Sequence, residues 1–359
     1  MRWWWLGAGG LAAVLTAAAF PAALGRSLAG AAIGARAGVD ATRERPDGLH
    51  VALCGAGSPL PDPTRAGPCS VVIAGHRMFM VDAGEGGARN MVLMRIPNGR
   101  VEAVFLTHLH SDHIDGLPPA MLLRWTGANA TSPVPIYGPT GTAGVVAGFN
   151  AAYATDHGFR TAHHGAAIAP PRGAGGIGRD FALPPPGDGS PVRVWEGDGV
   201  TVTAFRVDHG PVEPAVGYRF TYKGRSVVFS GDTSATPAIV RNARGADLLI
   251  HEGLQPRLVG LMTTTLERRQ AHGLAKITRD ILDYHATPEE VAAEAQAAGV
   301  RNLVFSHTIP QLPSPLMYPA FLGDARSRFD GTIIVGEDGM VFSLPAAGGT
   351  MALRRWPVR

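Results

Sequence analysis

The sequence predicts an α/β protein in which two halves, each made of strands and then helices, pack sheet to sheet with the helices outside. Short apolar runs rich in strand-forming residues alternate with helical segments, and this order occurs twice along the chain. Apolar residues make up 45% of the 359 residues and charged residues 17%, which is typical of a globular protein. The net charge of +3, without a dense basic cluster, gives no sign of a nucleic-acid surface.

The first 31 residues predict a signal peptide or membrane anchor. The second residue, Arg2, is basic, and residues 6–25 carry no charge. Residues 29–31 are small and offer a cleavage site, although the apolar run is also long enough to cross a bilayer. We favour export with cleavage, so the protein is expected in the periplasm, or else anchored to the inner membrane facing it. Residues 32–47 are then a linker, and residues 48–346 form one large domain.

The first half of this domain contains alternating apolar runs and helical patterns. The expected strands are 49–54, 70–74, 78–81, 101–106 and 135–137, and the expected helices are 87–95, 117–125 and 142–153. Glycine and proline dominate from residue 155 to residue 189, which predicts a long surface loop and not a second domain. Its three histidines are expected to face solvent, because no strand or fixed spacing supports them.

The second half repeats this organisation. The expected strands are 192–195, 200–207, 215–221, 226–230, 247–251 and 302–306, followed by a terminal hairpin of 332–335 with 340–344. Residues 265–282 carry a helical pattern. The helix at 288–298 has the clearest boundaries, because Thr287 is a good N-cap, Pro288 suits the first helical position and Gly299 suits the end.

The two cysteines, Cys54 and Cys69, lie at the end of one expected strand and the start of the next. If these strands pair, the cysteines could lie opposite each other and form a disulfide in an oxidising compartment. Two buried free thiols are the alternative, and we favour it because connectivity cannot be derived from sequence alone.

The loop from Thr107 to Gly116 contains three histidines and an aspartate within six residues: His108, His110, Asp112 and His113. An apolar strand precedes the loop and a helix follows it, so a rigid scaffold can orient these side chains. Neutral imidazole and carboxylate are the usual ligands of zinc and its first-row neighbours. Four such groups this close together cannot all bind one ion without strain, so the spacing indicates two adjacent ions.

Three isolated residues could complete a two-metal site: His209, Asp232 and His307. Each lies just past the end of an expected strand, as His108 does. Alone, each is an ordinary polar residue in a turn. Combined with the loop they make a set of seven ligands.

With these residues in place, the chain resembles the metallo-β-lactamase superfamily and, within it, the ribonuclease Z and arylsulfatase-like branch. The matching stretches occur in the order of that family: Gly55-Ala56-Gly57-Ser58-Pro59, Thr107 to Gly116, Asp208-His209, Gly217-Tyr218-Arg219-Phe220, Ser230-Gly231-Asp232-Thr233, His251-Glu252, His285-Ala286-Thr287 and Ser306-His307-Thr308. The resemblance implies a four-layer αββα sandwich with a dinuclear metal site along one edge.

The resemblance also implies a role for each site residue. It places His108, His110 and His209 on one divalent ion, Asp112, His113 and His307 on the other, and Asp232 between both. Zinc is the expected metal, with manganese or iron as alternatives, and a hydroxide shared by the two ions would attack an ester. Asp112 would also orient or deprotonate that water. Glu252 and His285 would pass a proton to the leaving oxygen, or else only support the ligands.

Features around the site lead us to expect a small substrate. In bacterial tRNA-processing relatives a long arm is inserted between the positions of His209 and Asp232, but here that interval is only 23 residues. With an export signal, this favours a hydrolase of a small phosphodiester, sulfate ester or related ester, with no nucleic-acid partner and with a homodimer left open. The alternatives are a ribonuclease Z-type endonuclease acting on RNA and a non-catalytic metal-binding protein. A lactonase or true β-lactamase is disfavoured by Asp232 and the His251-Glu252 pair.

Overall fold

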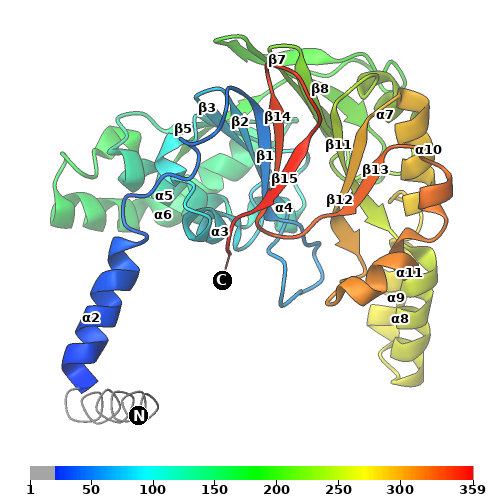
Figure 1. Ribbon diagram of the computed structural model, residues 1–359, viewed down its shortest axis with the longest axis horizontal. Helices are drawn as coiled ribbons and strands as arrows, with labels where there is room; N and C mark the ends of the chain where they lie inside the picture. The colour runs from blue at the N-terminus through cyan, green and yellow to red at the C-terminus, as the bar shows by residue number, and fades with distance from the viewer. Residues whose placement is uncertain (1–20, 359) are drawn as a thin grey trace, which may run out of the picture. The chain divides into compact units, whose positions relative to one another are not determined.

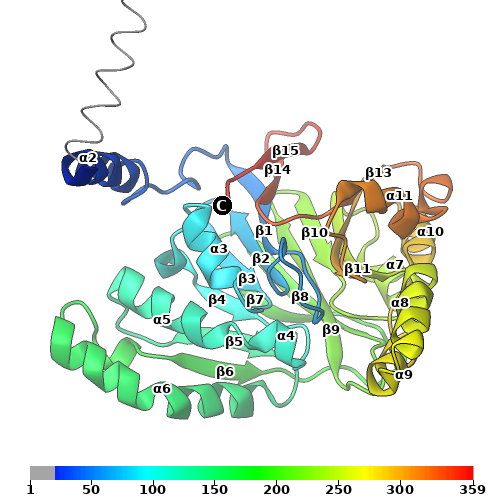
Figure 2. The same cartoon turned by 90° about the horizontal axis from the view of Figure 1, so that it is seen from below.

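The computed structural model describes residues 21–358, and within residues 44–358 two β-sheets pack face to face with helices on both outer faces (Figures 1 and 2). The expected four-layer αββα sandwich is confirmed.

The first sheet has eight strands in the order β15-β14-β1-β2-β3-β4-β5-β6. Their bounds are β1 (Gly48–Gly55), β2 (Cys69–Ala74), β3 (Arg77–Val81), β4 (Ala103–Phe105), β5 (Val134–Gly138), β6 (Gly176–Asp180), β14 (Met340–Pro345) and β15 (Ala352–Arg355). From β3 to β6 all neighbours are parallel. Their carboxyl ends therefore meet at one edge of the sandwich, where ligands bind in open α/β sheets.

The second sheet has seven strands in the order β13-β12-β11-β10-β9-β8-β7. Their bounds are β7 (Val192–Gly197), β8 (Val200–Val207), β9 (Ala215–Tyr222), β10 (Arg225–Phe229), β11 (Leu248–Leu254), β12 (Asn302–Ile309) and β13 (Thr332–Val335). The neighbours from β10 to β13 are parallel, and β8 runs in the same direction because β9 is antiparallel to both β8 and β10.

Helices cover the outer face of each sheet. Those in the described domain are α3 (Gly87–Leu93), α4 (Ser111–Ile114), α5 (Leu117–Ala128), α6 (Thr142–His164), α7 (Pro237–Asn242), α8 (Pro256–Arg268), α9 (His272–Asp280), α10 (Pro288–Ala298) and α11 (Tyr318–Leu322). Buried side chains pack these helices against the sheets. On the first sheet they are Met91 of α3, Met121 of α5 and Val146 of α6, and on the second Ile239 of α7 and Val291 of α10.

The core between the sheets is aromatic. Phe105 of the first sheet and Phe220 of the second are fully buried, and their rings meet edge to face with centroids 5.4 Å apart. Truncating either ring to alanine would cost about 3–5 kcal/mol, because a close-packed core cannot collapse into the cavity. Contacts such as this one hold the two sheets face to face, and so fix where their edges meet.

The expected terminal hairpin is wrong. Strand β13 pairs in parallel with β12, and β14 pairs antiparallel with β1, so the two segments lie in different sheets. Each segment pairs with a strand that would otherwise be an unpaired edge, β12 or β1, and a hairpin between the two segments would leave both edges open. Strand β15, which lies beyond residue 346, then adds to β14.

The expected surface loop at 155–189 contains regular structure. Helix α6 continues to His164 and ends at Gly165, whose φ of +78° favours glycine. The Gly-rich strand β6 is held at the sheet edge because the Asn150 side chain bonds both the N–H and the C=O of Gly176. Glycine content therefore marked an edge strand as well as a loop.

The helical pattern at 265–282 is two helices and not one. Helix α8 ends at Arg268 and α9 begins at His272, with Gln270 between them in a left-handed conformation, φ +57°.

The cysteines form a disulfide, so the expectation of free thiols is wrong. Strands β1 and β2 pair with Gly55 opposite Cys69, which brings the Cα atoms of Cys54 and Cys69 to 5.0 Å. This lies inside the range that a disulfide requires.

At the N-terminus the structure describes helix α2 (Pro21–Gly34), in which no residue is buried. The expected signal segment falls largely on residues 1–20, outside the described residues. Among the helices that the structure describes, none is long and apolar enough to cross a membrane.

Candidate metal centre

The seven expected ligands come together at one edge of the sandwich. They follow the carboxyl ends of β4, β8 and β10 or lie near the end of β12, and these strands point to the same edge. The residues are His108, His110, Asp112 and His113 after β4, His209 after β8, Asp232 after β10, and His307 within β12.

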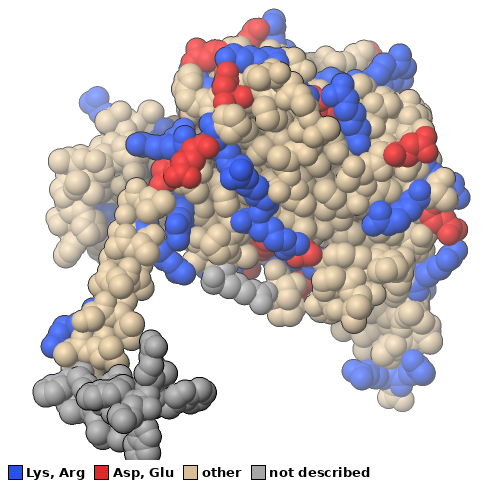
Figure 3. Space-filling model, in the orientation of Figure 1, with Lys and Arg blue, Asp and Glu red and all other residues tan. Residues whose placement is uncertain are grey.

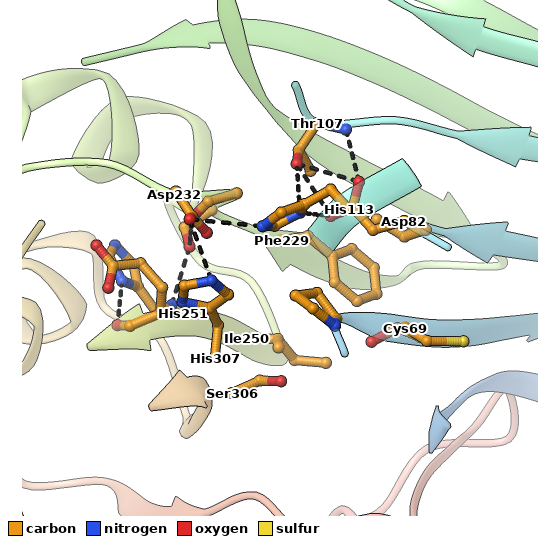
Figure 4. Close-up of a pocket in the computed structure, with 16 residues that line it drawn as sticks. Cys69, Asp82, Thr107, His113, Phe229, Asp232, Ile250, His251, Ser306 and His307 are labelled. Atoms are coloured by element: carbon orange, nitrogen blue, oxygen red, sulfur yellow. Dashed lines mark hydrogen bonds and ion pairs between the residues drawn. The ribbon is translucent and has the colours of Figure 1, made fainter. Parts of the chain in front are cut away.

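Asp232 lies at the centre of this cluster. Its Oδ2 atom is 3.2 Å from Nε2 of His307 and 3.5 Å from Nε2 of His113. Figure 4 shows Asp232 facing both imidazoles. The same oxygen is 4.0 Å from Nε2 of both His108 and His209. One carboxylate oxygen thus faces imidazoles that come from both sheets.

The donor atoms fall into two groups, each spanning no more than 4.8 Å. One group is His108, His110, His209 and Asp232, and the other is Asp112, His113 and His307. This is the division that the sequence resemblance implies, with Asp232 3.2 Å from a member of the second group.

Burial and charge set the protonation of the central groups. Burial holds the pKa of His108 well below its ordinary value, with the neighbouring His113 acting in the same direction. Burial alone would raise the pKa of Asp232, but His307 and His113 outweigh it and hold that pKa well below the usual range. His108 is therefore neutral and Asp232 ionised, which are the forms that bind a metal ion.

His113 tests whether the cluster fits a cation. Burial lowers its pKa, but Asp232, Asp82 and Asp112 outweigh burial and raise the pKa well above the ordinary value. Its Nε2 atom is buried and has no hydrogen-bond partner, while carboxylate oxygens of Asp112 and Asp232 lie 3.5 Å away. Two carboxylates therefore face an unpartnered imidazole nitrogen, and a third, Asp82, lies at the other nitrogen of the same ring. This excess of negative charge fits divalent cations.

Comparison with known proteins identifies the family. Residues 77–308 match the family described as the beta-lactamase superfamily domain. The chain is 36% identical over 295 residues to ribonuclease Z of Mycobacterium bovis, covering 81% of this chain and 96% of that protein. The chain belongs to the metallo-β-lactamase superfamily, in its ribonuclease Z branch. It is therefore a metal-dependent hydrolase.

Other relatives agree with this membership. Ribonuclease Z of Mycolicibacterium paratuberculosis is 37% identical over 292 residues, covering 81% of this chain and 96% of that protein. Human tRNase Z, short form, superposes with a TM-score of 0.56 at 22% identity, covering 82% of this chain and 99% of that one. A metallo-beta-lactamase fold protein of Bacillus subtilis also has a TM-score of 0.56, at 19% identity, covering 83% and 100%. These structural likenesses support the fold.

The expectation of a small ester substrate without a nucleic-acid partner is wrong, because the relatives are ribonucleases by name. It relied on the missing arm between His209 and Asp232, on the expected export signal, and on a net charge of only +3 without a dense basic cluster. Net charge is a sum over the whole chain, whereas binding to phosphates depends on local charge. Figure 3 shows several groups of Lys and Arg side chains on the visible face.

Sequence reasoning missed Asp82, which orients the metal-binding loop of this superfamily member. Its Oδ1 accepts a hydrogen bond of 2.8 Å from the Thr107 N–H, and its Oδ2 lies 3.0 Å from Nδ1 of His113. A carboxylate at Nδ1 leaves Nε2 facing the cluster. Asp82 directly follows β3, with φ +55°, so the rule that singled out Asp232, a polar residue just past a strand end, could have found it.

Two glycines allow the loop to approach the turn that carries Asp82. A Cβ atom added at Gly84 would lie 2.4 Å from the Asp112 carbonyl oxygen, and one at Gly116 would lie 2.3 Å from the Gly84 carbonyl oxygen. Larger residues at either position would therefore push the loop away from the turn.

Backbone groups orient two further histidines. Nδ1 of His209 lies 3.1 Å from the Tyr284 carbonyl oxygen, so it donates the hydrogen bond and leaves Nε2 free to bind a metal ion. His307 has φ +56°, and its N–H donates to the Ala56 carbonyl oxygen at 3.0 Å. Ala56 is itself held by its N–H bond to Asp338.

Glu252 and His285 form a buried pair beside the cluster. Oε1 of Glu252 accepts from the Ala286 N–H at 3.0 Å and lies 3.2 Å from Nδ1 of His285, although this second contact is not aligned as a hydrogen bond. Burial lowers the pKa of His285, but Glu252 outweighs burial and raises it. The His285 ring lies 5.2 Å from that of His209 and 5.9 Å from that of His307, centroid to centroid. His285 thus lies next to the expected metal site, beside a carboxylate that favours its protonated form.

Proposed function

We propose that this protein is an endoribonuclease of the ribonuclease Z type, which hydrolyses phosphodiester bonds in RNA. The observation that carries the proposal is the 36% identity to ribonuclease Z over 96% of that relative's length, with the ligand set of this chain intact. Fold alone would not carry it, because one fold hosts many functions.

The ligand roles follow from the grouping of donor atoms. His108, His110 and His209 would hold one divalent cation, and Asp112, His113 and His307 the other, with Asp232 facing both. Zinc is the expected metal because the set combines imidazole with carboxylate, which manganese and iron also accept. When bound, two such cations would polarise a phosphoryl oxygen and lower the pKa of a coordinated water.

Asp112 is the carboxylate that would orient and deprotonate the attacking water. Its Oδ2 lies 3.3 Å from Nε2 of His307, and its side chain is 13% exposed, more than that of Asp232 at 4%. Burial would raise its pKa, but the histidines outweigh burial and lower it, so Asp112 is ionised. This carboxylate would orient the water and accept its proton.

His285 would protonate the leaving oxygen. Its raised pKa keeps a proton on the ring, and Glu252 stabilises the resulting imidazolium. Ester cleavage releases an alkoxide that needs this proton, so the pair lowers the barrier for the ribose leaving group. The alternative, that the pair only supports the ligands, predicts no dependence on the leaving group.

The test is cleavage of defined RNAs by the metal-loaded protein. A transcript that contains a tRNA with extensions at both ends, and an unstructured RNA of equal length, are incubated with the wild type and with Asp232→Asn. We expect discrete products from the wild type, and none after chelation or in the variant. Failure to cleave any RNA, with bis(p-nitrophenyl) phosphate still hydrolysed, would contradict the proposal.

A further inference from the structure

The α8–α9 hairpin, residues 256–280, projects from the helical layer of the second sheet. Figures 1 and 2 show both helices at the outside of the fold, apart from the sheets. The hairpin starts just after β11, which carries Glu252, and the chain returns from it directly to His285. Both of its ends are therefore attached beside the metal centre.

Few contacts of the hairpin serve the fold. In α8 only Val259 is buried, and in α9 only Ala275 and Thr278. The helices are joined to each other by a hydrogen bond of 2.8 Å between the hydroxyls of Thr263 and Thr278. Twenty-two residues in two helices that bury so little are more than the core requires, so their exposed faces are available to a partner.

The free end of the hairpin is positively charged. Arg268 and Arg269 lie at the turn, and both are exposed. The adjacent acid Glu267 is already paired with Arg279. Among the residues that the structure describes, neither Arg268 nor Arg269 forms an ion pair. In Figure 3, Lys and Arg side chains gather at the lower end of the region where Figure 1 draws α8 and α9.

We propose that the α8–α9 hairpin is a docking arm for RNA, and that its tip binds backbone phosphates distant from the scissile bond. The proposal rests on the ribonuclease function proposed above. An α8 of 13 residues is about 20 Å long, so the tip reaches phosphates several nucleotides from the metals. The interval from His209 to Asp232, where a long arm would be inserted, is only 23 residues. The hairpin would supply the distant phosphate contact from another part of the chain.

Charge favours RNA over a second copy of the chain as the occupant. Two hairpins meeting tip to tip would bring Arg268 and Arg269 of each copy together, which costs free energy, whereas phosphates neutralise them. The exposed Leu274 and Ile277 on α9 could bury each other in a dimer, and that outcome is part of the test.

The experiment compares the double variant R268A/R269A with the control R172A/R179A, which removes two exposed arginines from the other half of the fold. The Kd and KM for the tRNA-containing transcript are measured over a range of salt concentrations. Each lost phosphate contact lowers the slope of log Kd against log salt by about 0.7–0.9. For R268A/R269A we expect a slope smaller by about 1.4–1.8 and a higher KM, with kcat for the transcript and turnover of bis(p-nitrophenyl) phosphate unchanged.

Three results would overturn the docking arm. They are an unchanged slope and KM in R268A/R269A, an equal loss in the control, and a dimer that Ile277→Glu dissociates while RNA binding stays intact. If the wild type cleaves RNA in these cases, only the docking arm fails. If the wild type neither binds nor cleaves RNA, the proposed function fails as well.

Discussion

Replacing Asp82 by asparagine should weaken metal binding while leaving the fold intact. Asp82 is 6% exposed, and its carboxylate accepts from the N–H and hydroxyl of Thr107 at 2.8 and 2.9 Å and faces Nδ1 of His113 at 3.0 Å. Asparagine keeps the shape but turns one acceptor oxygen into a donor and removes the charge. The new NH2 group then faces one of the donors that the carboxylate had accepted from, which costs about 1–3 kcal/mol of folding stability.

The affinity for the metal ions should also fall. Groups that orient a metal-binding imidazole typically contribute 10–100-fold to affinity, which is about 1.4–2.7 kcal/mol. Titration of the purified protein against a chromogenic chelator measures the affinity, and denaturant unfolding measures stability separately. Asp47→Asn is the matched control, because Asp47 also accepts from a hydroxyl, that of Tyr222 at 2.9 Å, but is half-exposed. Metal affinity in Asp82→Asn equal to that of the control would refute this role.

Four further outcomes are expected. Asp232→Asn should lower metal content and abolish turnover together, so full occupancy with normal activity, measured by metal analysis and kinetics, would contradict its central role. His285→Ala should keep its metals but lose about 10²–10⁴-fold activity on esters with poor leaving groups and far less on nitrophenyl esters; equal losses would show that it does not act as an acid. Changing Cys54 and Cys69 to serine should lower the free energy of unfolding by about 3 kcal/mol in denaturant titrations, because the disulfide closes a loop of 15 residues, and an unchanged midpoint would argue against the bridge. The uncharged run at residues 6–25 is still predicted to direct export, so a reporter fused after the first 48 residues should be active outside the cytoplasm, and activity confined to the cytosol would refute this.

Much of this molecule follows from local patterns in the sequence. Most strand and helix positions in both halves could be predicted because each of these elements keeps its own periodicity, whereas β6 and the division between α8 and α9 could not. The helix that begins after Thr287 also carries its own capping box. The dense loop from His108 to His113 indicated metal chemistry because few other roles require those residue types at that spacing.

Distant ligands could be predicted from a shared rule. His209 and Asp232 each follow a strand, and strands that run in the same direction present their carboxyl ends at one edge. The sequence could thus indicate that such residues meet. The distances between their atoms, and the place of Asp232 among four imidazoles, depend on how the two sheets pack through contacts such as that of Phe105 with Phe220.

Other features depend on partners far apart in the chain. The strand next to which β13 and β14 each pair determines the sheet to which each belongs. The role of Asp82 depends on β4, the neighbouring strand that places Thr107 beside it. The Cys54–Cys69 bridge depends on the register of β1 and β2, because a one-residue slip would turn one cysteine to the opposite face of the sheet. Sequence by itself therefore determined most of the secondary elements and the chemical type of the site, because these depend on neighbours along the chain. Tertiary structure decided the sheet edges, the orientation of the ligands and the projection of the α8–α9 hairpin, because these depend on contacts between segments that only the folded chain brings together.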